Sequence, residues 1–169
     1  MALCQHVTIL FSCAVATGLL AAPAHAQDVS KLTSIVDWSL YTDSEKPHAF
    51  CFLTSTPKSA NASSDGARIY ISAWPKEGVK AEPSVRLGFA TKKGSEITAA
   101  IGAQSFTLFT DKERAYVADA TSELKLVEAM RKGSKLAVTA TDPSGTSVTD
   151  TYSLAGLGQA MQELQSTCF

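Results

Sequence analysis

The chain has 169 residues, of which 45% are hydrophobic and 18% are charged, and its formal net charge is −1. This size and composition fit one globular domain, and the chain is too apolar to be disordered. The near balance of acidic and basic residues argues against a nucleic-acid-binding protein, because such proteins usually carry a basic excess.

The N-terminal segment, residues 1–26, has the pattern of a secretory signal peptide. The uncharged apolar run Val7–Leu20 is followed by small residues that end at Ala26, and the run is too short to cross a bilayer comfortably. We therefore predict cleavage between Ala26 and Gln27, export to the periplasm or the outer surface, and no integral membrane segment in the mature chain. The alternative, an uncleaved anchor, is disfavoured because Pro23 and its neighbouring alanines break the run.

The rest of the chain is predicted to form one β-rich domain, residues 35–169, after a flexible polar arm at 27–34. Short segments alternate between apolar and polar residues, which is the period of a half-buried strand. Polar, Ser-, Gly- and Pro-containing stretches at 57–66 and 75–83 predict loops. We expect strands near 35–40, 49–55, 69–73, 85–89, 96–101, 104–110, 115–117, 136–140 and 146–152.

Two helices interrupt the strand pattern. The first is expected at about Ser122–Lys132, with Ser122 as its N-cap and Gly133 ending it. The second follows Ser153, its expected cap, and carries apolar residues at helical spacing up to the C-terminus. The predicted fold is therefore mainly β: an antiparallel β-sandwich or a partly open barrel, with two short helices, the second at the C-terminus.

Two cysteines, Cys51 and Cys168, remain in the predicted mature chain. In an exported protein, two cysteines most simply form one disulfide. Cys168 continues the apolar stripe of the C-terminal helix, so it is expected to face the strand that carries Cys51. The bond would fasten the C-terminal helix to the sheet. The alternative is two independent buried thiols.

The predicted mature chain is poor in residues for catalysis or metal binding. Its one histidine, His48, follows Pro47 in a turn-like stretch typical of the surface, whereas a catalytic base must be oriented toward a nucleophile. One histidine and two cysteines do not make a zinc site. We therefore predict no catalytic residue, no cofactor and no metal. Trp74, which precedes Pro75 at a loop entrance, and His48 are the candidates for a binding face.

Several segments between Trp38 and Cys168 together resemble the invasion-associated locus B family of exported bacterial proteins. The resemblance implies an envelope or secreted protein of a Gram-negative cell. The name of the family comes from host-cell invasion, so the resemblance also implies an association with virulence. It implies no catalytic residues, and only Cys51 and Cys168 correspond, as a disulfide. The segments that carry the resemblance are Trp38–Tyr41, Cys51–Pro57, Ile101–Phe109, Ala115–Val117, Leu126–Gly133, Asp150–Gly156 and Cys168.

The leading hypothesis is a non-enzymatic exported module that binds a protein or polymer in the envelope or on a host surface, and no nucleic acid. One alternative is a hydrolase of envelope polymers that uses His48 or a carboxylate pair in a cleft. The nearest such pairs, Asp111 with Glu113 and Asp142 with Asp150, have the setting of solvated turns. Another alternative is a periplasmic inhibitor or chaperone-like protein, for which an exposed strand edge or protruding loop is expected.

Overall fold

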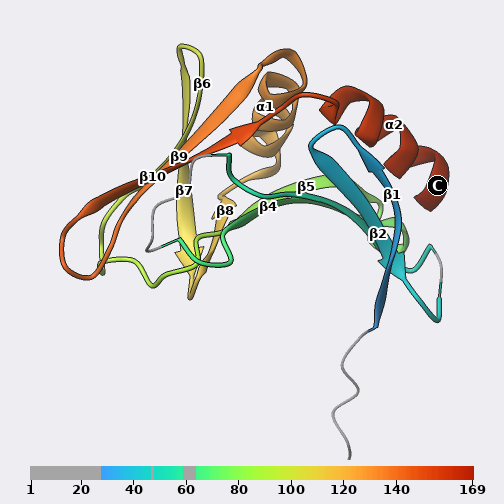
Figure 1. Ribbon diagram of the computed structural model, residues 1–169, viewed down its shortest axis with the longest axis horizontal. Coiled ribbons are helices and arrows are strands. Elements are labelled where there is room, and N and C mark those ends of the chain that lie inside the picture. Colours follow the sequence, from blue (N-terminus) through green and yellow to red (C-terminus); the bar gives the residue numbers. More distant parts are fainter. Residues whose placement is uncertain (1–27, 47, 59–63) are drawn as a thin grey trace, which may run out of the picture.

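The computed structural model describes residues 28–46, 48–58 and 64–169 (Figure 1). The predicted signal peptide and its cleavage site between Ala26 and Gln27 lie outside these residues. Ten strands form one antiparallel sheet in the order β1-β2-β3-β4-β5-β8-β7-β6-β9-β10, which does not close into a barrel. In this part of the chain no helix is long and apolar enough to span a membrane.

The mainly β, antiparallel fold with two helices, the second at the C-terminus, confirms the prediction. It takes the form of a single open sheet. The helices are α1 (Ala120–Lys132) and α2 (Leu157–Cys168), with a short 3₁₀ turn, η1 (Pro75–Glu77). The strands are β1 (Val29–Ile35), β2 (Trp38–Asp43), β3 (Cys51–Ser55), β4 (Arg68–Trp74), β5 (Val79–Arg86), β6 (Ile97–Ile101), β7 (Gln104–Asp111), β8 (Arg114–Val117), β9 (Lys135–Thr141) and β10 (Ser147–Ser153).

The sheet consists of three runs of neighbouring strands, β1–β5, β6–β8 and β9–β10, joined side by side. The first two runs meet where β5 pairs with β8 through Ser84–Arg86 only, and β6 pairs with β9 to join the third. The sheet also curls. This is seen from a hydrogen bond in which the backbone N–H of Lys58, after β3, donates to the carbonyl of Thr151 in β10 at 2.7 Å. Strands far apart in the sheet order therefore approach each other.

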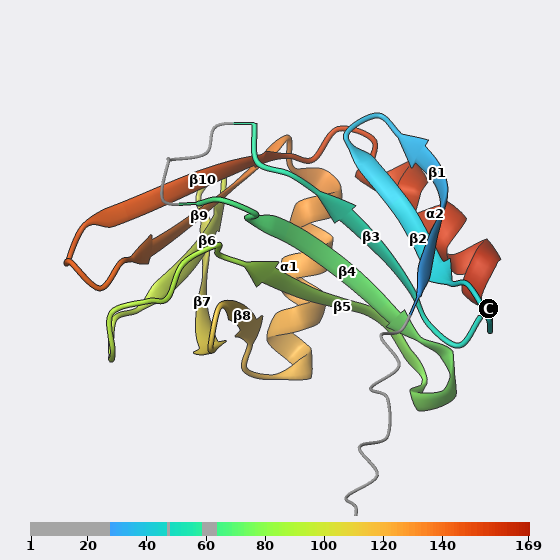
Figure 2. The same cartoon turned by 60° about the horizontal axis from the view of Figure 1, so that its bottom comes forward.

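One face of the sheet forms the core together with both helices. In β4, for example, Ile69, Ile71 and Ala73 are at most 1% exposed, while the residues between them point to the opposite face. The helix α1 packs against β5, β7 and β8, and α2 packs against β1, β2 and β3. Figure 2 shows both helices behind the sheet, on this one side. Neither α1 nor α2, the two α-helices of the described residues, covers the opposite face of β2–β5 and β8.

The N-terminal arm is one correction to the predicted organisation. Residues 29–34 were expected to be loose, but they lie in β1, which pairs with β2 along its length. The polar pattern arose because β1 is an edge strand whose side chains are mostly exposed. A second difference is that Val36, which was expected in a strand, lies outside one. It occupies the β1–β2 turn with φ +52° and is 72% exposed.

The second predicted loop, 75–83, is also largely structured. After η1, strand β5 begins at Val79 and runs through Pro83. Proline removes a backbone donor and is tolerated in a strand where no partner needs that donor. Here β8 pairs with β5 only from Ser84 onward, which leaves Pro83 beyond that ladder.

The helix starts differ from the predicted ones by a few residues. The N-cap of α1 is Asp119, whose carboxylate accepts a hydrogen bond from the backbone N–H of Ser122 at 3.0 Å. In α2 the N-cap is Gly156, with φ +82°. Ser153 is not the cap, because its hydroxyl oxygen accepts from the N–H of Ala155, before the helix begins. Ser and Asp compete for such caps, so pattern alone places a helix start only approximately.

Candidate functional site

The uncovered face of the sheet carries a set of aromatic side chains, which we call the aromatic row. Tyr41 stacks on Phe52 with ring centres 5.1 Å apart, and Phe52 contacts Tyr70 at 5.9 Å. Farther along the sheet, Tyr116 contacts Phe109 at 5.8 Å. The small residue Ser84 of β5 lies in register between Tyr70 and Tyr116. Neighbouring strands thus place these rings on one surface.

Beside the aromatic row lie three arginines, which we call the arginine row. Arg68 of β4 is directly opposite Arg86 of β5, and Arg86 is opposite Arg114 of β8. All three side chains are exposed. Like charges at directly opposed positions destabilise a sheet. The mutual repulsion of the arginine row therefore works against the stability of the sheet.

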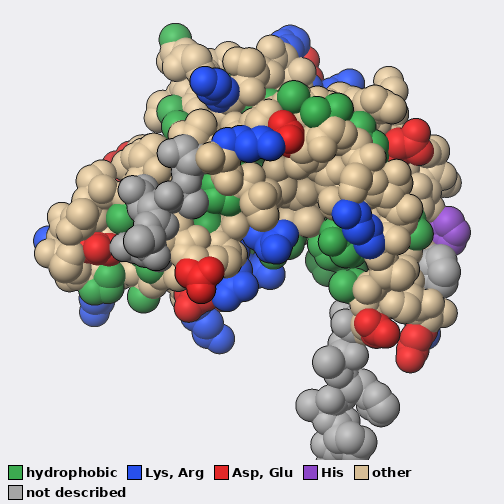
Figure 3. All heavy atoms as spheres, in the orientation of Figure 1, with side chains coloured by type: hydrophobic (Ala, Val, Ile, Leu, Met, Phe, Trp, Pro, Cys, Tyr) green, Lys and Arg blue, Asp and Glu red, His purple; other side chains and the backbone are tan. Residues whose placement is uncertain are grey.

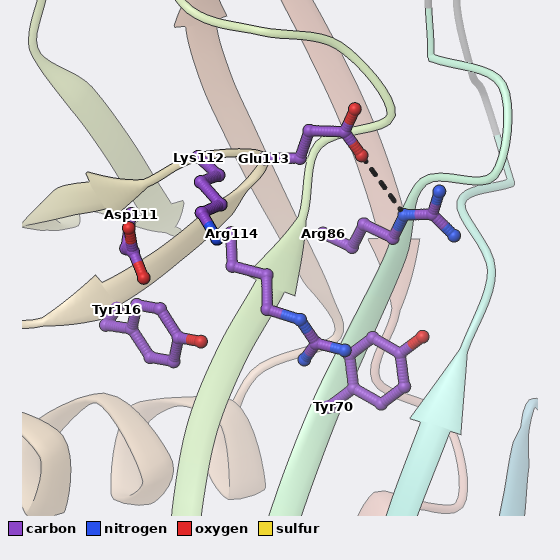
Figure 4. Close-up of a pocket in the computed structure, with 7 residues that line it drawn as sticks. All are labelled: Tyr70, Arg86, Asp111, Lys112, Glu113, Arg114 and Tyr116. Carbon is purple, nitrogen blue, oxygen red and sulfur yellow. Dashed lines mark ion pairs between the residues drawn. The ribbon is translucent and has the colours of Figure 1, made fainter. Parts of the chain in front are cut away.

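A cavity of about 460 Å³ lies where the two rows meet at the β7–β8 turn (Figure 4). Arg114 crosses the cavity, with its guanidinium carbon 4.9 Å from the centre of the Tyr70 ring. Figure 3 shows Lys and Arg side chains together with hydrophobic ones on the hollowed underside of the molecule. The cavity is lined by Tyr70, Arg86, Asp111, Lys112, Glu113, Arg114 and Tyr116.

The ionic contacts in the cavity are weak. Arg86 Nε lies 3.6 Å from Glu113 Oε2, and the two side chains are 45% and 52% exposed. Exposed pairs of this kind contribute at most about 1 kcal/mol, because water screens both charges. A ligand with its own negative charge can therefore displace Glu113 from Arg86 at little cost.

The turn that forms one wall of the cavity is conformationally strained. Asp111 pairs with Arg114, so Lys112 and Glu113 form a two-residue hairpin loop. Lys112 has φ +58°, in the left-handed region that glycine and asparagine favour in such loops. Strained residues of this kind cluster at functional sites.

The carboxylates of the cavity do not converge. In Figure 4, Glu113 points toward Arg86, while Asp111 points to the other side of the turn, with Lys112 and Arg114 between them. This arrangement does not aim two carboxyl groups at one bond, as glycoside hydrolysis requires.

The other carboxylate pair that the sequence suggested is divided between a turn and the core. Asp142 is half-buried in the β9–β10 turn, where it accepts from the Ser144 hydroxyl at 2.6 Å and from the Thr146 N–H at 2.9 Å. These hydrogen bonds lower the pKa of Asp142, and the bond from the Ser144 hydroxyl has the largest effect. Asp150 is instead buried in β10, 4% exposed. Asp142 therefore has a structural explanation as a turn residue.

Comparison with known proteins places the chain in a family. The model of the family described as "Invasion associated locus B (IalB) protein" matches residues 38–165. The chain belongs to the IalB family. A crystal structure of invasion associated protein B from Bartonella henselae has a similar fold, with a TM-score of 0.59 and 16% sequence identity over 81% of this chain and 96% of that one. No curated protein is a significant sequence match.

In this IalB-family chain the two cysteines lie together. Cys51 of β3 and Cys168 at the end of α2 have Cα atoms 6.2 Å apart, within the range of a disulfide, and the structure joins them. They are 0% and 4% exposed. Among the described residues, no group of at least three His, Cys, Asp or Glu is arranged to hold a metal ion.

The two side chains suggested as a binding face, His48 and Trp74, do not line the cavity of this IalB-family member. His48 is exposed in the β2–β3 connection, with φ +74°. Trp74 is half-buried at the end of β4, stacks on Phe50 at 5.5 Å and donates its indole N–H to Glu82 at 2.9 Å. Trp74 lies on the same face as Tyr70, but it is held by its own neighbours.

Sequence reasoning missed the arginine row and both tyrosines of the cavity. A signal was present, because the pattern Arg-x-Tyr occurs twice, at Arg68–Tyr70 and at Arg114–Tyr116. Residues two apart in a strand share a face, so each copy places a guanidinium beside a phenol. Only the pairing of β4, β5 and β8 brings Tyr70 of one copy and both residues of the other to one cavity, while Arg68 lies outside its lining.

Proposed function

We propose that the protein is exported and acts by binding a partner in the cell envelope or on a host surface, without catalysing a reaction. The observation that carries this proposal is the arginine row beside the aromatic row, over a cavity on the uncovered sheet face. Arginine and tyrosine are, with tryptophan, the residue types most enriched in binding hot spots; here the arginines are exposed and the tyrosines half-buried. Membership of the IalB family supports an invasion-associated role.

The geometry of the titratable groups favours binding over hydrolysis. Within the described part of the chain, no hydrogen bond or ion pair orients His48 toward a nucleophile, and the carboxylates of the cavity point apart. A hydrolase needs a nucleophile or water held between oriented groups.

Export is supported by the signal-peptide pattern and by the cysteine pair. Intact-mass analysis of the protein recovered from cells tests both, because it expects a chain that begins at Gln27 and gains two hydrogen atoms on reduction. A chain that begins at Met1, or two free thiols before reduction, contradicts this part of the proposal.

The binding function is tested with fluorescently labelled protein, purified after expression of the full chain and added to bacterial envelopes and to mammalian cells. We expect saturable adsorption to one of these surfaces, and its loss in the double variant Arg86→Ser/Arg114→Ser. The matched control is Lys92→Ser/Lys93→Ser, which removes the same charge from exposed positions outside the cavity. Equal adsorption by both variants refutes the assignment of the face. Release of soluble fragments from envelope polymers by the wild type refutes the non-enzymatic role.

A further inference from the structure

We propose that the cavity between the arginine row and the aromatic row binds an acidic saccharide, a chain of sugar rings that carry carboxylate or sulfate groups. This inference rests on the proposed binding function and names its ligand class. It is carried by the register of the arginines, by the mixture of hydrogen-bonding groups, and by the strained turn.

The arginine row has the spacing of a binding site for repeated negative charges. Neighbouring strands are about 4.8 Å apart, so Arg86 and Arg114 in the cavity lining and Arg68 next to it span roughly 10 Å across β4, β5 and β8. Each guanidinium presents a fork of donors that matches a planar anionic group such as a carboxylate. A single small anion binds one guanidinium group, whereas a chain with acidic groups at intervals binds several guanidinium groups. Such a ligand also relieves the repulsion between the opposed arginines.

The groups around the arginines match hydroxyl-rich ligands. The phenol groups of Tyr70 and Tyr116 donate and accept hydrogen bonds, and the carboxylates of Asp111 and Glu113 accept them. In Figure 4 the Tyr116 hydroxyl and the Arg114 guanidinium point into the same space. Sugar hydroxyls supply the donors that these carboxylates need, and acidic substituents supply the charge that the arginines need.

The same mixture disfavours a nucleic acid. The backbone phosphates of a nucleic acid carry no hydroxyl donor for Asp111 and Glu113, whereas a sugar chain does. Single-stranded nucleic acids also need free aromatic faces on which bases stack. Here Arg114 already lies over the Tyr70 ring, at 4.9 Å from its centre.

Lys112 provides the third observation. Its positive φ is unfavourable for lysine, yet the turn puts an ammonium group at the edge of the cavity. Glycine at this position fits the backbone better and removes the charge. The structure therefore predicts that Lys112→Gly stabilises the free protein while it weakens ligand binding, a combination that damage to the fold does not produce.

The test is isothermal titration calorimetry of the full protein with four probes of similar length. These are a heparin hexasaccharide, a hyaluronan hexasaccharide, neutral maltohexaose and an oligothymidylate. We expect binding of at least one acidic saccharide, with affinity that falls as salt rises, and no binding of maltohexaose. Arg86→Ser/Arg114→Ser is expected to weaken that binding by about tenfold or more, because the charge-assisted hydrogen bonds of two guanidinium groups are lost. Lys112→Gly is expected to weaken it several-fold while raising the melting temperature, and Lys92→Ser/Lys93→Ser to leave it unchanged.

Three outcomes overturn the inference. If the oligothymidylate binds as tightly as the acidic saccharides, the site attracts negative charge without selecting sugars. If both double variants weaken binding equally, the binding is not located in the cavity. If no acidic saccharide binds while cell adsorption still depends on Arg86 and Arg114, the ligand class is wrong but the proposed binding function stands. Absence of adsorption to any envelope or cell removes the proposed function itself. Melting curves of each variant verify that the fold is retained.

Discussion

Removal of the link between Cys51 and Cys168 is expected to lower the melting temperature substantially. The two residues are 117 positions apart in the chain, and the chain-entropy model gives such a loop an upper value of about 4.8 kcal/mol at 25 °C. Native disulfides typically contribute about 2–4 kcal/mol. For a domain of this size, each kcal/mol shifts the melting temperature by about 3–4 °C. We therefore expect a decrease of roughly 6–16 °C.

The folded structure itself is expected to change little when the link is absent. The helix α2 is also held by Leu157, Ala160 and Leu164, each at most 1% exposed. These side chains keep the helix on the sheet below the melting temperature. The lost stability therefore comes mainly from the greater freedom of the unfolded chain. Far-UV circular dichroism at room temperature is expected to be the same with and without the link.

Thermal melts of three samples separate the cross-link from the sulfur atoms. Oxidised wild type, wild type under a reductant, and Cys51→Ala/Cys168→Ala are compared, with the oxidation state of each verified by intact mass. The reduced wild type keeps both sulfur atoms in the core, so its decrease measures the cross-link alone. An unchanged melting temperature on complete reduction refutes the reasoning.

Substitutions at three further positions test the packing, a helix cap and the backbone. Met130→Ala, at a helix position that is 0% exposed, is expected to cost about 2–5 kcal/mol in the free energy of unfolding, measured with urea. Asp119→Ala is expected to lower the melting temperature at neutral pH, because it removes the cap of α1. The hydrogen bond from the backbone N–H of Ser122 lowers the pKa of the Asp119 carboxyl below 3.8. The difference in melting temperature from wild type therefore shrinks as the pH falls through this lowered pKa, where Asp119 becomes protonated. Asp119→Asn keeps the cap without the charge and is expected to lack this pH dependence. Gly156→Ala is expected to lower the free energy of unfolding by about 1–3 kcal/mol, because the φ of Gly156 is +82° and a Cβ at this position would lie 2.8 Å from the Val36 side chain. An unchanged free energy of unfolding would show that the loop shifts freely.

Most of the fold was predictable because the core strands face solvent on one side only. In β4, Ile69, Ile71 and Ala73 alternate with exposed or half-buried residues, and this alternation is visible in the sequence. Where that condition fails, the prediction fails. The strand β1 is an edge strand with few buried residues and therefore has a polar pattern. The strand β5 contains Pro83, a residue that signals a loop unless the sheet order is known.

The candidate site was not predictable because its residues meet through strand pairing between distant segments. Arg68 and Arg86 belong to neighbouring strands, but Arg114 joins them only because β8 pairs with β5. The sequence places β6 and β7 between these partners, and no local pattern specifies that they are passed over. The cysteine pair was easier to identify, because only two cysteines remain in the predicted mature chain.

The pairing of β5 with β8 has a consequence for the dynamics of the domain. The ladder along this seam is short: it pairs Ser84–Arg86 with Arg114–Tyr116, and one further backbone hydrogen bond runs from the N–H of Leu87 to the carbonyl of Glu113 at 2.9 Å. Short ladders open more readily than long ones, so their backbone amides are expected to exchange hydrogen faster than those of the β4–β5 ladder. A ligand that contacts both Arg86 and Arg114 spans the seam and closes it. Occupancy of the cavity is therefore expected to appear as slowed amide exchange along β5 and β8, where two runs of strands join in one sheet.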